Sequence, residues 1–429
     1  MSEYLVKNTI KQNIKVRVPG SKSITNRALL LAALGNGVTT IYGGLKSADS
    51  EHFLKCLSQL GFIIDENDDR IIIEGNDGRI PCKEASIYVG SAGTAARFLT
   101  SMLAMSDGEY EVTSSEQMAK RPMKDLITAL EELGAVFEYY GEEYSLPFKV
   151  KGMFHKSVQN VKFKFNVCVN IDKSSQFLSA LLMTAPMLKK RLDIKLTGNR
   201  TAKSYVAITI KMMEQFGVTV VCPDDDNYYI EADSSYIGCE YRCEPDVSAA
   251  CYFYAMAAVC GITATVKDVH LDSMQGDIRF LDVLQNMGCT ICDMEEGVSV
   301  AGTGTLKGVS VNMSDFSDQT MTLAAIAPFA SGKVVISNVA HIRGQESDRL
   351  SAIENELTRM GIKCETTPDG ITIYEGEPKP ALIETYDDHR IAMAFAVTGL
   401  VAKGIRINNP QCCSKTFPEY FEVLDGLTQ

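Results

Sequence analysis

One short pattern recurs six times along the chain, and this repetition constrains the fold more than any other feature. The pattern is a pair of large apolar residues three positions apart, followed by glycine and then by a stretch rich in β-branched residues. Its period of about 70 residues is typical of a repeated supersecondary unit. The sixth copy is degenerate, with Asp425 before its glycine. The glycines are Gly61, Gly134, Gly217, Gly288, Gly361 and Gly426.

Each copy predicts a helix, a glycine stop and a hairpin. Apolar residues at i and i+3 mark the buried face of a helix, and glycine ends helices because it accepts positive φ. Residues 362–364 and 371–374 then read as two strands joined by a turn at Asp369-Gly370. A second helix, apolar nearly all round and therefore buried, precedes each copy. These six helices are expected to begin near Ser23, Thr94, Ser175, Ser248, Asp318 and His389.

The repeats predict a mixed α and β fold with two domains of three repeats each. Each domain would have buried helices inside and sheets outside. A chain of 429 residues is long enough for two or three domains with separate cores. The chain is expected to cross between the domains near residue 240, shortly after the acidic turn at residues 223–229, without a flexible linker.

Composition argues against several classes of protein. The net charge of −12 disfavours nucleic acid and anionic membranes as partners. No run of apolar residues approaches the length of a membrane span, and the first residues lack the apolar core of a signal peptide. The 13 cysteines are irregularly spaced, which favours a reducing cytoplasm. Cys289 and Cys292 lie on an expected strand, facing opposite sides, so we expect no zinc site.

Small polar residues and a cation stand together at several predicted helix starts. Residues 19–27, 90–97 and 387–390 all have this character. A helix start offers unpaired N–H groups and a partial positive charge, and a neighbouring Lys or Arg completes an anion site. Residues 20–23 lack the glycine spacing of a nucleotide-binding phosphate loop. The pattern therefore predicts a strongly anionic small molecule held from several sides.

Acids and bases gather in the last two repeats. Asp318 precedes an apolar helix, where it could either cap that helix or act as a base. Glu346 and Arg349 are three positions apart, which predicts one face of one helix. Asp388-His389-Arg390 places an acid, a titratable base and a bidentate cation at one helix start. No Ser-His-Asp order or glycine elbow indicates a hydrolase.

Seven motifs, in order between Val18 and Phe421, together resemble the 5-enolpyruvylshikimate-3-phosphate synthase family. They are residues 19–27, 92–97, 121–123, 174–182, 346–350, 388–393 and 415–421. The resemblance implies the enolpyruvyl transferase fold, with two inside-out α/β barrels joined by two crossing strands. It also implies domains at residues 18–241 and at 242–429 plus 1–17, with the active site in the interdomain cleft.

The resemblance further implies a reaction. The family transfers the enolpyruvyl group of phosphoenolpyruvate to the 5-hydroxyl of shikimate-3-phosphate and releases phosphate, by addition and elimination, on the route to chorismate and the aromatic amino acids. The chain would act as a cytoplasmic monomer on these two small molecules, without a cofactor or metal and without nucleic acid or membrane partners. Gly93 keeps the small residue that allows the herbicide glyphosate to compete with phosphoenolpyruvate, so sensitivity is expected.

Site residues carry over by motif position. The catalytic residues implied are Asp318, Glu346 and Lys22. Those implied for shikimate-3-phosphate are Lys22, Ser23, Arg27, Ser174, Ser175, Gln176, Tyr205, Asp318, His341 and Gln345. Those implied for phosphoenolpyruvate are Lys22, Gly93, Arg121, Gln176, Arg349, His389, Arg390 and Lys415. Thr94 and Arg97 would support the helix starts.

The chain departs from the family pattern at a few positions. Gln345 stands where many members have Lys, His341 where many have Asn, Ala202 where many have Ser, and Phe98 where some have Pro. One alternative is the related UDP-N-acetylglucosamine enolpyruvyl transferase, which normally carries a reactive cysteine that residues 114–118 lack. Another is a non-catalytic phosphometabolite-binding protein, which could lose Asp318 or Glu346. A third, an RNA-end enzyme with similar repeats, is disfavoured by the acidic net charge.

Overall fold

The computed structural model describes residues 3–67, 70–158, 164–198 and 203–428. Ala202, one of the departures from the family pattern, lies outside these residues. The chain divides into two compact units. We call Gly20–Cys243 the N-terminal unit, and Met1–Pro19 together with Glu244–Gln429 the C-terminal unit. Within the described residues, no helix is long and apolar enough to cross a lipid bilayer.

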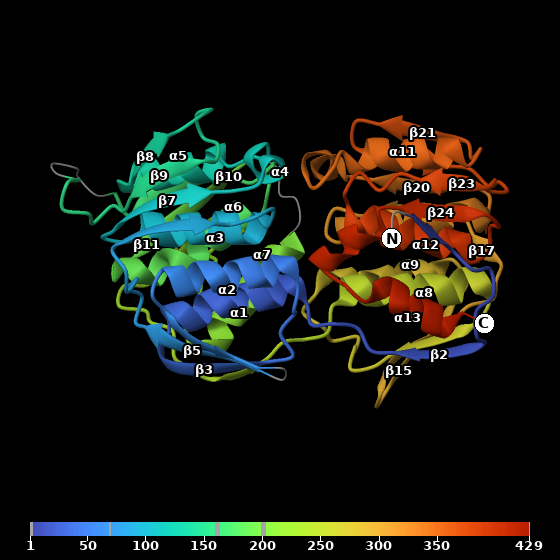
Figure 1. Cartoon of the computed structure of the whole chain (residues 1–429), viewed down its shortest axis with the longest axis horizontal. Coiled ribbons are helices and arrows are strands. Elements are labelled where there is room, and N and C mark those ends of the chain that lie inside the picture. Colours follow the sequence, from blue (N-terminus) through green and yellow to red (C-terminus); the bar gives the residue numbers. More distant parts are fainter. Residues whose placement is uncertain (1–2, 68–69, 159–163, 199–202, 429) are drawn as a thin grey trace. The chain divides into compact units, whose positions relative to one another are not determined.

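The N-terminal unit contains three repeats, each with a buried helix inside and a sheet outside (Figure 1). The inner helices are α1 (Lys22–Leu34), α3 (Gly93–Ala104) and α6 (Gln176–Thr184), which pack against one another. The helices that precede the repeated glycines are α2 (Ala48–Gln59), α5 (Lys124–Leu133) and α7 (Lys203–Gln215). A short helix, α4 (Glu116–Ala119), lies between α3 and α5.

The sheets of the N-terminal unit share one topology. In the second and third sheets the strand before the inner helix pairs in parallel with the strand after it, and in the first sheet a strand from the end of the unit takes that place. The hairpin adds antiparallel strands beyond. The first sheet has the order β13 (Glu240–Arg242), β3 (Asn36–Tyr42), β5 (Arg70–Asn76), β4 (Ile63–Glu66). The second is β6 (Glu84–Tyr88), β7 (Glu109–Thr113), β9 (Phe148–Lys151), β8 (Val136–Tyr139). The third is β10 (Asn166–Asn170), β11 (Leu192–Thr197), β12 (Asn227–Ile230), with only an isolated bridge from Val221 to Tyr229 in place of a fourth strand.

The C-terminal unit repeats the plan. Its inner helices are α8 (Val247–Cys260), α10 (Thr320–Ile326) and α12 (His389–Gly399), and its outer helices are α9 (Phe280–Asn286), α11 (Arg349–Arg359) and α13 (Tyr420–Leu427). The fourth sheet is β15 (Thr290–Met294), β16 (Gly297–Ala301), β14 (Thr263–Val266), β2 (Asn13–Val16). The fifth is β18 (Ser310–Asn312), β20 (Val334–Ser337), β22 (Gly370–Ile373), β21 (Cys364–Thr367), and the sixth is β1 (Glu3–Leu5), β24 (Ile405–Asn408), β23 (Ala381–Ile383). A short pair, β17 (Leu306–Lys307) and β19 (Ala330–Ser331), lies between the fourth and fifth.

Two strands do not join the sheet of the repeat that they precede in sequence, and each joins a sheet of the other unit's repeats instead. β2 comes before α1 but pairs in parallel with β14 of the C-terminal unit, and β13 comes before α8 but pairs in parallel with β3 of the N-terminal unit. The N-terminal β1 pairs antiparallel with β24, where the other repeats place their own hairpin strand. The sheets of each unit are therefore completed by segments distant in sequence.

The repeated glycines behave as predicted in five of the six copies. Gly61, Gly134, Gly217, Gly288 and Gly361 all have positive φ at the end of a helix. The sixth prediction is wrong, because Gly426 lies inside α13 and the helix continues to Leu427. The inner helices begin within two residues of the expected positions, and α8 is buried all round from Val247 to Val259.

Candidate active site

The N-terminal unit places three helix starts beside one another. Asn26 Nδ2 of α1 donates to Thr94 Oγ1 of α3 at 2.6 Å, and Arg97 Nη1 of α3 donates to Gln176 Oε1 of α6 at 2.7 Å. Lys22 begins α1, and its Nζ lies 3.6 Å from Asp49 Oδ2. The arrangement brings N–H groups and a cation together, as an anion site requires.

Gly93 and Arg121 are fitted to one another at the start of α3. A Cβ atom on Gly93 would lie 2.8 Å from Arg121 Nη1 and 2.9 Å from its Cζ. Arg121 Nη1 also donates to the carbonyl of Ser91 at 3.4 Å. Only glycine lets the guanidinium lie against this helix start, where Arg and the helix N-terminus both favour a bound anion.

Arg27 is buried rather than presented to solvent. Its side chain donates to Thr209 Oγ1 at 2.7 Å, to the carbonyl of Tyr205 at 3.1 Å and to the carbonyl of Ser23 at 2.8 Å, and lies over the ring of Phe98. Burial lowers the pKa of Arg27 to about 10. Within the described residues no carboxylate pairs with Arg27, so dipoles alone neutralise this cation, and a nearby anion would be stabilised.

In the C-terminal unit, Arg349 collects three carboxylates. Its Nη1 lies 3.0 Å from Asp318 Oδ1, its Nη2 3.0 Å from Glu346 Oε2 and its Nε 2.8 Å from Asp388 Oδ2. Its Nη1 also donates to the side-chain oxygen of Gln345. Burial alone would lower the pKa of Arg349, but the three carboxylates raise it above the usual value.

Asp318 and Glu346 each lie between two cations. Asp318 bonds Arg349 through Oδ1 and Arg390 Nη2 through Oδ2 at 2.6 Å. Glu346 bonds Arg349 through Oε2, and its Oε1 lies 3.5 Å from Lys415 Nζ. An incoming anion can take either carboxylate's place on these cations and leave that carboxylate available for proton transfer.

Of the two histidines of this region, His389 is buried and His341 is partly buried. His341 Nε2 lies 2.7 Å from Ser317 Oγ, and burial lowers the pKa of His341, which favours the neutral imidazole. His389 is the first residue of α12, next to Asp388, which caps the helix by accepting from the backbone N–H of Arg390. The prediction of an acid, a base and a cation at one helix start is confirmed.

One local prediction is wrong, and one of the two alternatives left open for Asp318 is excluded. Glu346 does not share a helix with Arg349, because α11 begins at Arg349 with Asp348 as its N-cap. Glu346 lies in the preceding loop and reaches the arginine from there. Asp318 does not cap α10 either, since it lies in a 3₁₀ turn, Ser317–Gln319, and uses its carboxylate on the two arginines.

The serines at the start of α6 play unequal parts. Ser174 Oγ accepts from the backbone N–H of Gln176 at 3.3 Å, which is a capping bond. Ser175 precedes the helix and its side chain makes no capping bond. Tyr205 lies on α7, where its carbonyl accepts from Arg27 and from Thr209 Oγ1. The structure therefore connects these N-terminal residues through α1, α6 and α7.

Three polar residues near these clusters were given no role in the sequence analysis. Asp49 is buried beside Lys22, and Asp277 and Ser248 are buried beside Arg390. Burial raises the pKa of Asp277 to about 6, the charge of Asp318 adds to this rise and Arg390 opposes it. No local pattern in the sequence marks these residues, because the partners of Asp49, Asp277 and Ser248 are distant along the chain.

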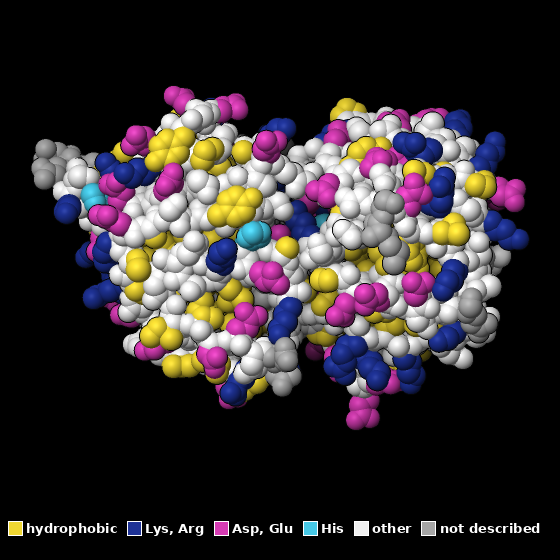
Figure 2. Space-filling view, in the orientation of Figure 1, with side chains coloured by type: hydrophobic (Ala, Val, Ile, Leu, Met, Phe, Trp, Pro, Cys, Tyr) yellow, Lys and Arg dark blue, Asp and Glu magenta, His cyan; other side chains and the backbone are white. Residues whose placement is uncertain are grey.

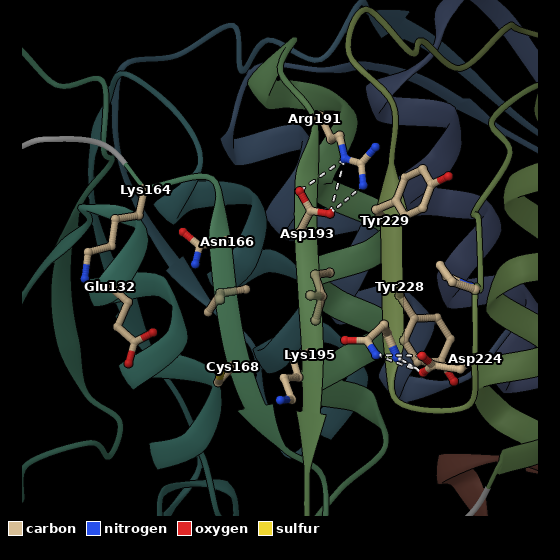
Figure 3. Close-up of a pocket in the computed structure, with 14 residues that line it drawn as sticks. Glu132, Lys164, Asn166, Cys168, Arg191, Asp193, Lys195, Asp224, Tyr228 and Tyr229 are labelled. Atoms are coloured by element: carbon tan, nitrogen blue, oxygen red, sulfur yellow. Dashed lines mark hydrogen bonds and ion pairs between the residues drawn. The ribbon is translucent and has the colours of Figure 1, made fainter.

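A cavity of about 440 Å³ lies elsewhere, on the outer face of the sheet β10-β11-β12 (Figure 3). Among its polar residues, Arg191 stacks on Tyr229 and bonds Asp193 at 2.8 Å, and Asn227 bonds Asp224. It is lined by none of the predicted site residues. We interpret it as a solvated sheet face.

Metal ligands are not grouped in the part of the chain that the structure describes, where no cluster of three His, Cys, Asp or Glu could hold an ion. All 13 cysteines are free. Figure 2 shows acidic and basic side chains interspersed over the surface of each unit in the view drawn.

Comparison with known proteins identifies the family. The family model of EPSP synthase (3-phosphoshikimate 1-carboxyvinyltransferase) matches residues 6–424. A 3-phosphoshikimate 1-carboxyvinyltransferase of Trichormus variabilis is 45% identical over 408 residues, covering 95% of this chain and 94% of the relative. The protein of Halalkalibacterium halodurans named 3-phosphoshikimate 1-carboxyvinyltransferase 2 is 38% identical over 416 residues, covering 96% and 91%.

A solved structure agrees. The EPSP synthase of Acinetobacter baumannii superposes with a TM-score of 0.80 at 25% sequence identity, covering 99% of this chain and 98% of the other. The alternative assignments, to a UDP-N-acetylglucosamine transferase or a non-catalytic binding protein, gain no support from these relatives. This chain therefore belongs to the EPSP synthase family, the 3-phosphoshikimate 1-carboxyvinyltransferases, and has the two-domain enolpyruvyl transferase fold.

Proposed function

We propose that two clusters of residues together form the site at which this enzyme transfers the enolpyruvyl group from phosphoenolpyruvate to shikimate-3-phosphate. One cluster surrounds Lys22, Arg27 and Arg121 in the N-terminal unit, and the other surrounds Arg349 in the C-terminal unit. The observation that carries the proposal is the position of Asp318 and Glu346, each between two cations. Such a pair provides a base and an acid next to groups that bind phosphate and carboxylate. The proposal places this site in the interdomain cleft, between domains at residues 18–241 and at 242–429 plus 1–17.

Phosphoenolpyruvate carries a carboxylate and a phosphate, and each unit offers cations for such groups. We assign it to the following residues. They are Lys22, Gly93, Arg121 and Gln176 of the N-terminal unit, and Arg349, His389, Arg390 and Lys415 of the C-terminal unit. Arg121 held against Gly93 supports the first group, and the buried fork of Arg349 supports the second.

Shikimate-3-phosphate has one phosphate, one carboxylate and two free hydroxyls. We assign it to Lys22, Ser23, Arg27, Ser174, Ser175, Gln176, Tyr205, Asp318, His341 and Gln345. The buried, carboxylate-free environment of Arg27 favours an anion near α1 and α7. Gln345 supplies an amide where a cation would otherwise stand, and its bond to Arg349 keeps it beside the acid–base residues.

The chemistry then follows in two steps whose atoms balance. Asp318 accepts the proton of the 5-hydroxyl as that oxygen attacks C2 of phosphoenolpyruvate, while Glu346 or Lys22 delivers a proton to C3. The product of this addition is a tetrahedral ketal. In the second step the C–O bond to phosphate breaks, a proton leaves the methyl group for Glu346 or Lys22, and the enol ether forms. The released phosphate takes up the proton that Asp318 accepted, which restores the carboxylate. Arg121, Arg349, Arg390 and Lys415 would stabilise the departing phosphate and the carboxylate.

We further propose that the enzyme acts as a cytoplasmic monomer without a cofactor, and that glyphosate inhibits it. The free cysteines support a reducing compartment. The Arg121 guanidinium, which lies against Gly93 at the start of α3, supports a site that accepts a small phosphonate anion.

The test is phosphate release from phosphoenolpyruvate by the purified protein without added metal. One sample receives shikimate-3-phosphate, one receives UDP-N-acetylglucosamine and one receives no acceptor. We expect release only with shikimate-3-phosphate. Release only with UDP-N-acetylglucosamine would transfer the assignment to the related enzyme, and no release by folded protein that binds both substrates would favour a binding role.

A further inference from the structure

A ring of interactions lies next to Arg390 in the C-terminal unit, formed by hydrogen bonds and one ion pair and closed by the peptide link between Asp318 and Gln319. Asp277, in the 3₁₀ turn Gly276–Arg279, accepts from Ser248 Oγ at 2.7 Å through Oδ2 and from Gln319 Nε2 at 3.3 Å through Oδ1. Ser248 Oγ in turn lies 3.5 Å from Arg390 Nη2. Arg390 Nη2 bonds Asp318, whose chain neighbour is Gln319. Asp277 is thus linked through Ser248 to Arg390, which we assign to phosphoenolpyruvate. Through Gln319 it is linked to the chain segment that holds Asp318, the proposed base.

The ring is built into the core. Asp277 is 5% exposed, Ser248 6% and Gln319 0%, so none of the three is a chance surface contact. A buried carboxylate is costly unless it is hydrogen-bonded and faces a cation, and here it has two donors and the field of Arg390. Gln319 is itself held by Thr322, whose hydroxyl donates to its side-chain oxygen at 2.9 Å. The acid is therefore rigidly placed.

We propose that Asp277 is a positioning residue that keeps Arg390 in its binding geometry when Asp318 leaves it. In the structure Arg390 is paired with Asp318, but an incoming carboxylate or phosphate must take that place before Asp318 can accept the hydroxyl proton. During this exchange the link through Ser248 and the negative charge of Asp277 hold the guanidinium. The inference rests on the proposed function, because it concerns the same cations and the same base.

The groups that face Asp277 decide its pH response. They are Asp318 on the following 3₁₀ turn, Arg390 on α12, and Asp246 and Cys251 at the start and in the body of α8. Burial raises the pKa of Asp277 to about 6, Asp318 and Asp246 also raise it, and Arg390 lowers it. Its negative charge is therefore present at neutral pH and is lost as the pH falls through about 6.

The test compares Asp277→Asn with Asp282→Asn, a control that makes the same chemical change at an exposed position on α9. Loss of a charged hydrogen-bond partner predicts a rise of about tenfold or more in the KM for phosphoenolpyruvate in Asp277→Asn. The KM for shikimate-3-phosphate is expected to change less than about threefold, and the control to match the wild type. Unchanged KM values in folded Asp277→Asn would overturn the proposal.

The pH profile separates positioning from a general structural defect. The ratio of the KM of Asp277→Asn to that of the wild type is expected to shrink between about pH 7.5 and about pH 5.5, because the wild type loses the same charge. Titration of the substrate affects both proteins and cancels in this ratio. A ratio that stays constant over this range would contradict the role assigned to the charge.

A second variant keeps the idea testable if Asp277→Asn folds poorly. Ser248→Ala removes the link to Arg390 and leaves Asp277 with Gln319. Ser248→Ala is expected to raise the KM for phosphoenolpyruvate. In the double variant with Asp277→Asn it should raise this KM much less than it does alone, because both changes break the same ring. If the wild type does not turn over, the proposed function fails. If the wild type turns over and both variants match it, only the positioning role fails.

Discussion

Asp318 and Glu346 derive their proposed roles from their neighbours. Two cations hold each carboxylate before substrate arrives, so each carboxylate has a fixed position and each cation has a temporary counter-charge. We propose that substrate anions then replace the carboxylates on the cations. Substrate binding and the release of the carboxylates for proton transfer would then be one event.

Replacing Asp318 by Asn removes the proposed base and keeps the shape of the side chain. We expect kcat to fall by roughly 10²- to 10⁴-fold, the usual contribution of a general base. Asp315→Asn is the matched control, because Asp315 lies in the same segment but pairs with Arg279 at a largely exposed position. Steady-state phosphate release measures both. A kcat for Asp318→Asn within a few-fold of the wild type would exclude Asp318 as the base.

Replacing Gly93 by Ala tests the fit between that residue and Arg121. The added methyl group would lie 2.8 Å from Arg121 Nη1, so the guanidinium must move. We expect a higher KM for phosphoenolpyruvate, by roughly tenfold if one charged hydrogen bond is lost, and weaker inhibition by glyphosate. Gly141→Ala serves as the control, because a methyl group there meets nothing within 4 Å. Equal glyphosate inhibition of Gly93→Ala and wild type would contradict this arrangement.

The sequence predicts the types of residue in the site better than their geometry. The clusters of Lys, Arg, Asp and Glu at helix starts indicate an anionic substrate because local chemistry carries that information. Glu346 was wrongly placed on a helix, because a spacing of three positions fits a loop before an N-cap equally well. Asp277 gave no signal, since its partners Ser248 and Gln319 are distant in sequence and meet it only after folding.

At the scale of elements, one arrangement of strands recurs around the inner helices. In four sheets a strand, an inner helix and a second strand parallel to the first form a βαβ unit. In the other two sheets the parallel partner comes from elsewhere in the chain, because β13 pairs with β3 and β2 pairs with β14. In the N-terminal unit the starts of the three inner helices are joined by the bonds from Asn26 to Thr94 and from Arg97 to Gln176.

β1 completes the sixth repeat, and its packing can be tested. Tyr4 is 7% exposed, lies 4.5 Å from Phe421 between ring centroids and donates to Asp425. We expect Tyr4→Ala to lower the free energy of unfolding by about 3 kcal/mol, as for other buried aromatic residues. Leu5→Ala, at a position 61% exposed, is the control and should change it little. Urea denaturation followed by circular dichroism measures both, and equal midpoints would show that β1 is dispensable.

The elements differ in how far their sequences determine them. Five glycine stops were predicted correctly because a helix end followed by a hairpin has a local signature. Gly426 was not a stop, because no hairpin follows it and the helix continues to Leu427. The exchange of β2 and β13 could not be foreseen from the residues, since parallel pairing between distant segments leaves no local pattern.

At the scale of the whole molecule, charge is distributed unevenly. The chain has a net charge of −12, yet its buried cations, such as Arg27, Arg349 and Arg390, lie in the two candidate clusters. A negative net charge disfavours the binding of nucleic acid and other polyanions. We therefore expect the buried cations to bind small anions, with little competition from large ones.

We propose that both units contribute cations to the same pair of substrates. A crystal structure of the protein with shikimate-3-phosphate and glyphosate, the proposed competitor of phosphoenolpyruvate, would show the contacts of both ligands. We expect Lys22 and Arg121 of the N-terminal unit and Arg349, Arg390 and Lys415 of the C-terminal unit all to contact the glyphosate. We also expect Asp318 to have left Arg390 and to lie within hydrogen-bond distance of the 5-hydroxyl. Ligands held by one unit alone, with Asp318 still paired to Arg390, would contradict this proposal.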